Sequence, residues 1–187
     1  MKTNRNIASG LLAALVLVSV ILACKGTTTD ETDKANKLVD EGNAAIAEGK
    51  KILNEAEDKK NTMLHTNVAQ LGEARTLANE AIRDYDQAEE KCKDAAAKYD
   101  EASKLKTDDK FKEYLSLKVK EYNKRAEMVE AMKATPQALI DSQNRAAFVS
   151  RANAANEKAT RLGKEADDLS AQADKIQKDN PQSFKKS

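Results

Sequence analysis

The fold is decided by residues 71–105, LGEARTLANEAIRDYDQAEEKCKDAAAKYDEASKL. Alanine recurs in this stretch every seven residues, at Ala74, Ala81, Ala88, Ala95 and Ala102. A second row of the same period stands three residues earlier and consists of Leu64, Leu71, Ala78, Tyr85, Cys92 and Tyr99. Rows separated by steps of three and four residues form one face of a helix, the a and d positions of a heptad repeat. The spacing predicts a long helix over 62–105 that packs against other helices.

The segments on either side of this stretch carry related patterns. Near the carboxyl end, the row Phe148, Ala155, Leu162, Leu169 and Ile176 is flanked by the alanine row Ala152, Ala159, Ala166 and Ala173. Before the stretch, small residues recur every seventh position at Ala35, Gly42, Gly49 and Ala56. After it, one helical face carries Phe111, Leu115, Val119, Tyr122, Ala126, Val129 and Met132. Because small side chains allow helix axes to approach to about 8 Å, these rows predict close antiparallel packing.

Local signals set the predicted helix ends. Asn61 and Thr62 can end one helix and cap the next, and Lys106-Thr107-Asp108-Asp109 has the pattern of a turn with a capping residue. Thr135-Pro136 is a cap followed by proline at a first helical position, and Asn180-Pro181 ends the last helix. We therefore expect helices over about 32–59, 62–105, 108–134 and 136–179, within a domain of residues 32–180, and a basic tail at 181–187. The predicted fold class is all-α: an elongated four-helix bundle or antiparallel coiled coil with alanine-rich heptads.

The composition limits the functional classes. The chain has 187 residues, about one domain, with 32 Lys and Arg against 31 Asp and Glu. Since 34% of the residues are charged and the two signs balance, no nucleic-acid-binding face is expected. Many acidic residues stand four positions before a basic one, as Glu121 does before Arg125, and such pairs are typical of solvated helix surfaces.

The amino terminus has the pattern of a targeting segment. Lys2 and Arg5 precede an uncharged apolar run over 7–23, which is slightly short for a membrane span of about 20 residues. The run closes on Ile21-Leu22-Ala23-Cys24, which resembles the lipobox of bacterial lipoproteins. The resemblance implies a signal peptide over 1–23, cleavage between Ala23 and Cys24 by signal peptidase II, and diacylation of the Cys24 sulfur. The alternative is an uncleaved transmembrane anchor with an unmodified Cys24.

The lipoprotein resemblance also implies a location. Residues 24–31 would form a lipidated tether, and Lys25 replaces the aspartate that retains enteric lipoproteins in the inner membrane. We expect a lipid-anchored protein of the cell envelope, with the periplasmic face of the outer membrane favoured and the cell surface as the other location. The partners expected are the membrane, through the anchor, and another protein or a second copy, through the helices.

Residues with catalytic or metal-binding chemistry are scarce. His65 is the single histidine and has no glutamate three residues before it, which excludes a ferritin-like di-iron site. If His65 and Cys92 share one helix, they lie about 40 Å apart and cannot share a metal. Cys92 packs as a small apolar residue or forms an intermolecular disulfide. We expect no catalytic, cofactor-binding or metal-binding residues, and no enzyme activity.

Two functional hypotheses follow. The first is a membrane-anchored envelope lipoprotein of structural or adaptor type, which tethers or spaces through a rigid helical surface. The second is a helical binding module, such as a surface adhesin, an inhibitor or a peptide-binding groove. Leu38-x3-Gly42-Asn43-x5-Gly49 resembles the first helix of a tetratricopeptide repeat, which implies such a groove. The 34-residue period of that repeat places Thr76 where Gly42 would recur.

Overall fold

The protein is a bundle of four long helices. The computed structural model describes residues 28–67 and 70–184, so the predicted signal peptide and the Ala23–Cys24 cleavage and lipidation site lie outside the described residues. The elements are α1 (Thr28–His65), α2 (Leu71–Ser103), α3 (Asp109–Asp141), α4 (Arg145–Asp179) and the short 3-10 helix η3 (Pro181–Phe184). The predicted all-α four-helix bundle is confirmed.

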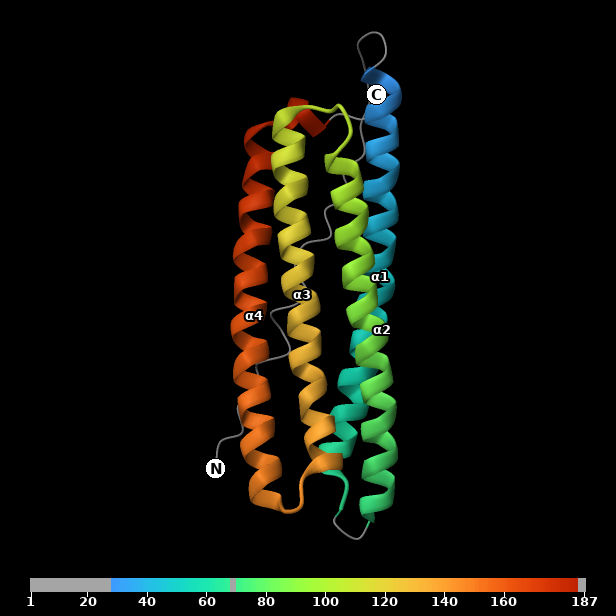
Figure 1. Cartoon of the computed structure of the whole chain (residues 1–187), viewed down its shortest axis with the longest axis vertical. Helices are drawn as coiled ribbons and strands as arrows, with labels where there is room; N and C mark the ends of the chain where they lie inside the picture. Colours follow the sequence, from blue (N-terminus) through green and yellow to red (C-terminus); the bar gives the residue numbers. More distant parts are fainter. Residues whose placement is uncertain (1–27, 68–69, 185–187) are drawn as a thin grey trace.

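The helices run alternately up and down, so that each is antiparallel to the next (Figure 1). The α1–α2 and α3–α4 connections lie at the lower end in this view, and the α2–α3 connection and η3 lie at the upper end. Extensive packing joins α1 to α2, α2 to α3 and α3 to α4. Within the described chain, no Cα atom of α1 lies within 8 Å of a Cα atom of α4. The bundle therefore has a gap between its first and last helices.

The heptad rows form most of the core, as predicted, but Leu64 and Leu71 at the beginning of the second row are exposed. In α2 the whole alanine row from Ala74 to Ala102 is buried, together with Tyr85 and Tyr99. The core divides into three clusters along the axis. The lower cluster is built on Met63, Ala74 and Ala78. The middle cluster includes Leu53, Tyr85, Met128, Val129 and Leu162, and the upper cluster includes Ala35, Tyr99, Phe111, Leu115 and Tyr122.

The predicted end of the first helix is wrong. Helix α1 already begins at Thr28, inside the predicted tether, and it continues through 59–62 to His65. It is therefore one unbroken helix, longer than the helices of a tetratricopeptide unit. Thr62 donates to the Asp58 carbonyl oxygen within the helix instead of capping a new one. The continuation buries Met63 in the lower cluster, and this apolar contact outweighs the weak local turn signal.

The predicted boundary at Thr135-Pro136 is also wrong. Helix α3 runs through both residues to Asp141, and α4 begins at Arg145, where the Asn144 side chain accepts from Ala147 N. Proline removes one backbone donor from the helix. Thr135 and Pro136 are both buried, so the burial of this turn offsets the lost hydrogen bond. The four helices have 38, 33, 33 and 35 residues, rather than the predicted short and long alternation.

The carboxyl end is packed where a loose tail was predicted. Phe184 of η3 makes edge-to-face contacts with Phe111 and Tyr114, at centroid distances of 5.5 and 5.1 Å. These contacts cover the upper end of the bundle beside the Asp108 cap, whose carboxylate accepts from Lys110 N at 2.8 Å. Residues 185–187 lie outside the described part of the chain.

The small-residue row of α1 packs against α2, and its two glycines have different surroundings. A Cβ atom at Gly42 would lie 3.4 Å from the Tyr99 ring, whereas a Cβ at Gly49 would lie only 2.9 Å from Lys91 Cβ. Alanine stabilises a helix interior by about 1 kcal/mol relative to glycine, whereas overpacking costs about 1–3 kcal/mol. We therefore expect an alanine substitution to change the free energy of unfolding in opposite directions at the two sites.

We expect Gly42→Ala to raise the free energy of unfolding by about 0.5–1 kcal/mol, because it adds helix propensity at an ordinary contact. Gly49→Ala is expected to lower it by about 1 kcal/mol, because α1 must move away from Lys91. Urea unfolding of the full chain, followed by circular dichroism, measures both. Shifts of the same sign at both glycines would contradict this account of the α1–α2 interface.

Candidate functional site

Charged side chains of α3 meet in the interior of the bundle. Glu121 is 1% exposed. Its Oε2 accepts from Lys118 Nζ at 2.5 Å, and its Oε1 accepts from Arg125 Nε at 2.9 Å. Arg125 Nη2 also donates to Asp167 Oδ1 of α4 at 3.1 Å, and Lys118 Nζ lies 5.0 Å from the centre of the Tyr122 ring. A buried carboxylate is tolerated here because its charge is paired and hydrogen-bonded.

This network affects the pKa values of Arg125 and of the neighbouring Tyr122. Burial would lower the pKa of the Arg125 guanidinium, but attraction to Glu121 and a hydrogen bond to it outweigh burial and raise that pKa. Burial is also the main reason that the pKa of Tyr122 is raised, and the Glu121 charge adds to the effect. At neutral pH the interior therefore holds a charged guanidinium beside a neutral phenol.

A cavity of about 230 Å³ lies against the charged network, and all four helices line it. Helix α1 contributes Ile46 and Leu53, α2 contributes Cys92, and α4 contributes Ser170. Because α1 and α4 do not approach each other closely, the cavity spans the gap between them. A concave space lined by both apolar and polar side chains is a common form of a small-molecule site.

Cys92 lies in the wall of this cavity and is half-buried. Burial raises the pKa of the Cys92 thiol to about 11, and the charge of Arg125 offsets only part of this effect. The position agrees with a packing role for this cysteine. An intermolecular disulfide stays a prediction: non-reducing electrophoresis would show a dimer that Cys92→Ser abolishes.

We expect Cys92 to react slowly with alkylating reagents. At pH 8, a thiol of pKa about 11 has roughly a hundredfold less thiolate than a free cysteine of pKa about 8.5. Iodoacetamide labelling at pH 8, followed by mass spectrometry, should therefore be about a hundredfold slower in the native chain than in urea. Native and denatured rates within threefold of each other would show that the thiol is not shielded.

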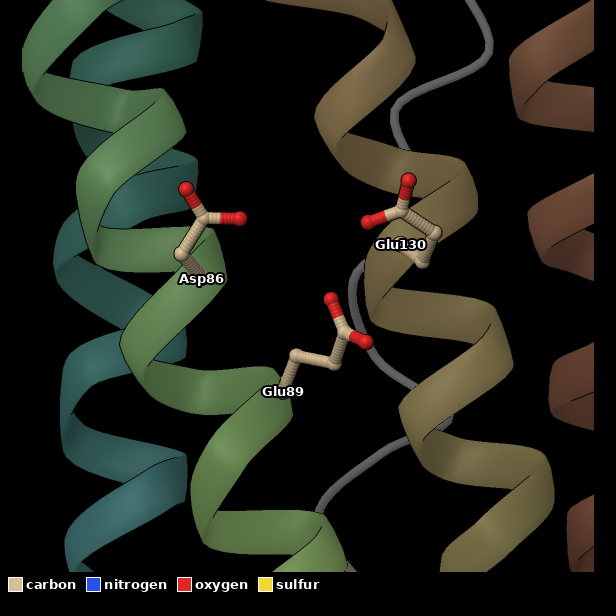
Figure 2. Close-up of side chains that lie close together, drawn as sticks. All are labelled: Asp86, Glu89 and Glu130. Carbon is tan, nitrogen blue, oxygen red and sulfur yellow. The ribbon is translucent and has the colours of Figure 1, made fainter.

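A second cluster is acidic and joins α2 to α3. The side chains of Asp86, Glu89 and Glu130 converge between these helices (Figure 2), and one carboxylate oxygen from each lies within 4.8 Å of the others. Lys133 Nζ lies within 4 Å of an oxygen of all three and is 2.7 Å from Asp86 Oδ1. Lys93 adds a second cation, 2.5 Å from Glu89 Oε1.

The two lysines explain why three carboxylates can lie together. Burial would lower the pKa of Lys133, but hydrogen bonds to Asp86 and Glu130 more than compensate and raise it. Lys133 therefore stays protonated, and together with Lys93 it offsets two of the three carboxylate charges. We interpret the cluster as an ion-pair network that aligns α2 with α3.

The other residues considered from the sequence are dispersed. His65 is the last residue of α1 and not part of α2, and its Nδ1 lies 2.7 Å from the Asn61 carbonyl oxygen. Cys92 lies 21 residues into α2, about 30 Å along that helix from its beginning near His65. His65 and Cys92 therefore lie on different helices and too far apart to share a metal ion.

The interior network was not predicted from the sequence. Glu121 and Arg125 were interpreted as a surface pair because acid and base four residues apart are typical of exposed helix faces. A signal was nevertheless present. Lys118, Glu121 and Arg125 follow Phe111 and Tyr114 in steps of three and four, so they share the stripe that enters the core.

Comparison of the chain with known protein families, with curated proteins and with solved structures finds no match. Among the helices described, none is both long and apolar enough to cross a membrane.

Proposed function

We propose that the protein is a lipid-anchored envelope protein of adaptor type, which holds a partner at a fixed distance from a membrane. The observation that carries this proposal is that the two ends of the bundle differ. Helix α1 begins only four residues after Cys24, so an anchor on that cysteine would attach at the upper end in Figure 1. Helix α1 then extends for 38 residues, or about 57 Å.

The lower end carries exposed apolar side chains. Leu64 is in the last turn of α1, Leu71 begins α2, and Val149 is near the start of α4; all three are exposed. The α1–α2 and α3–α4 connections are at this end in Figure 1. These exposed apolar residues at one end of the bundle are the surface that we expect to contact another protein. We call these three residues the apolar end.

The anchor is tested by mass spectrometry of the membrane-extracted protein. The expected species begins at Cys24 and carries acyl chains, because stable anchoring requires more than one chain. Cys24→Ser should keep residues 1–23 and lose the acyl mass. An intact Met1 in the wild-type protein, or an unmodified Cys24, would overturn the anchor.

The adaptor role is tested by crosslinking in cells. Serine at Leu64, Leu71 and Val149 together should abolish the crosslinked species of the wild-type protein and leave acylation and helix content unchanged. A matched control places serine at three exposed alanines of the helix surfaces, Ala44, Ala97 and Ala154. Equal crosslinking in both triple variants would show that the apolar end is not the docking surface.

The second candidate function is a helical binding module, and the central cavity favours it. Surface labelling in intact cells separates the two roles by location. A protein on the periplasmic face of the outer membrane is shielded from an impermeant reagent, whereas a surface adhesin is labelled.

A further inference from the structure

The central cavity has walls of opposite character. Its apolar part joins the upper and middle clusters and includes Ile46 and Leu53 of α1, together with Met128 and Val129 of α3. Its polar part is the network around Glu121. A wholly apolar ligand would have to displace water from these charges without replacing its hydrogen bonds, which is unfavourable. The cavity therefore suits a ligand with both apolar and charged groups.

The charges deepest in the cavity are already paired. Glu121 is bound by two cations, and Arg125 is shared between Glu121 and Asp167. These groups can form the wall of a site, but their charges are balanced within the protein. A ligand with a net charge would have to be matched by some other side chain.

Two other residues that line the cavity have opposite charges and no ion-pair partner among the described residues. Lys50 comes from α1 and is partly exposed, and Asp174 comes from α4 and is exposed. Among the described residues, no ion pair within 4 Å includes either of them. They belong to the two helices that flank the gap, so one cation and one anion border the same cavity from opposite sides. The six charged lining residues are three bases and three acids, which gives no net charge.

We infer that this cavity binds a small zwitterion with an apolar body, such as a free apolar α-amino acid. Its carboxylate would pair with Lys50, its ammonium group with Asp174, and its side chain would pack on Leu53, Met128 and Val129. A ligand with one charge would leave one of the two walls unmatched. The volume of about 230 Å³ is below the 300–1,000 Å³ typical of drug-sized ligands, which favours a single amino acid. The site depends on neither the anchor nor the apolar end, so it goes beyond the adaptor role.

The test is equilibrium dialysis of the full-length, detergent-purified protein with radiolabelled leucine, methionine and phenylalanine. At least one of these should bind saturably to one site per chain. The leucine derivatives N-acetyl-leucine and leucine methyl ester each lack one charge and serve as probes of the pairing. If leucine binds, each derivative should bind at least tenfold more weakly, because a charge-assisted hydrogen bond is lost; for another amino acid the corresponding derivatives are used.

Variants locate the binding. Lys50→Gln and Asp174→Asn should each weaken binding at least tenfold and keep the wild-type circular dichroism spectrum. Lys51→Gln and Asp168→Asn are matched controls on exposed positions of the same helices and should bind as the wild type does. Absence of saturable binding for all three amino acids would overturn the inference. Binding that neither Lys50→Gln nor Asp174→Asn weakens would overturn it as well.

Discussion

Replacing Glu121 with glutamine is expected to lower the free energy of unfolding by about 3–5 kcal/mol. The carboxylate is buried and pairs with both Lys118 and Arg125, while Asp167 pairs with Arg125 alone. An amide has the same shape but no charge, so both cations would remain in the interior without their common anion. Urea unfolding of the full chain measures the effect, and Glu127→Gln on the exposed side of α3 should change stability by less than about 0.5 kcal/mol.

A triple variant separates charge imbalance from loss of packing. Buried ionic networks can often be replaced by apolar residues of similar volume with neutral or stabilising effect. We expect Lys118→Met, Glu121→Leu and Arg125→Met together to be at least as stable as the wild type, although Glu121→Gln alone is strongly destabilised. The explanation fails if Glu121→Gln is no less stable than Glu127→Gln.

Alkaline pH is expected to unfold the bundle cooperatively. Burial is the main cause that raises the pKa of each of the four tyrosines, Tyr85, Tyr99, Tyr114 and Tyr122. Below pH 10 these phenols are protonated in both states, and their contribution to stability is complete. Above pH 10 the unfolded chain releases protons that the folded chain retains, so the free energy of unfolding falls as pH rises.

The slope of this loss can be estimated. Each tyrosine contributes about 1.4 kcal/mol per pH unit, so four give roughly 5–6 kcal/mol per unit above pH 10. Lysines with raised pKa values, such as Lys133, act in the same direction. Absorbance at 295 nm should show tyrosine ionisation only together with loss of helix. Tyr99→Phe should reduce the slope by about 1.4 kcal/mol per pH unit, which is the contribution of one proton. Ionisation of tyrosines in a bundle that keeps its helix content would contradict the prediction.

The alanine rows predicted the fold because they encode packing directly. Small side chains at every seventh position show which face of a helix packs against its neighbour. They also show how closely the two helix axes can approach each other. Tyr99 illustrates this: its row places it opposite the small residue Gly42, and its hydroxyl reaches Asn43 Oδ1 at 2.8 Å. The spacing of small residues therefore identifies the apolar face of each helix, but not the buried charges of α3.

Helix ends were predicted less well, because local signals compete with burial. Asn61-Thr62 offers a possible turn, but no glycine or proline enforces one, and Met63 gains a buried position if the helix continues. Pro136 is a stronger signal, yet its turn is buried and the helix passes through it. The free energy that decides these cases comes from contacts between distant residues, which local spacing does not contain.

The charged positions were the hardest to predict for the same reason. Lys98 has Asp94 four residues before it, but it pairs with Glu41 of α1 at 2.9 Å. Lys59 likewise pairs with Asp84 of α2 at 2.6 Å. The choice between an intrahelical and an interhelical partner depends on the register of α1 against α2. The cavity and its unpaired Lys50 and Asp174 depend on the placement of all four helices.

The order of the interfaces has a consequence for how the chain folds. Every extensive contact joins helices that follow one another in the chain, and α1 does not need α4 to complete its packing. The average sequence separation of contacting residues is therefore small, and chains of that kind fold in microseconds to milliseconds. Each hairpin can assemble as soon as its second helix forms, so the bundle can grow one helix at a time from the amino-terminal side.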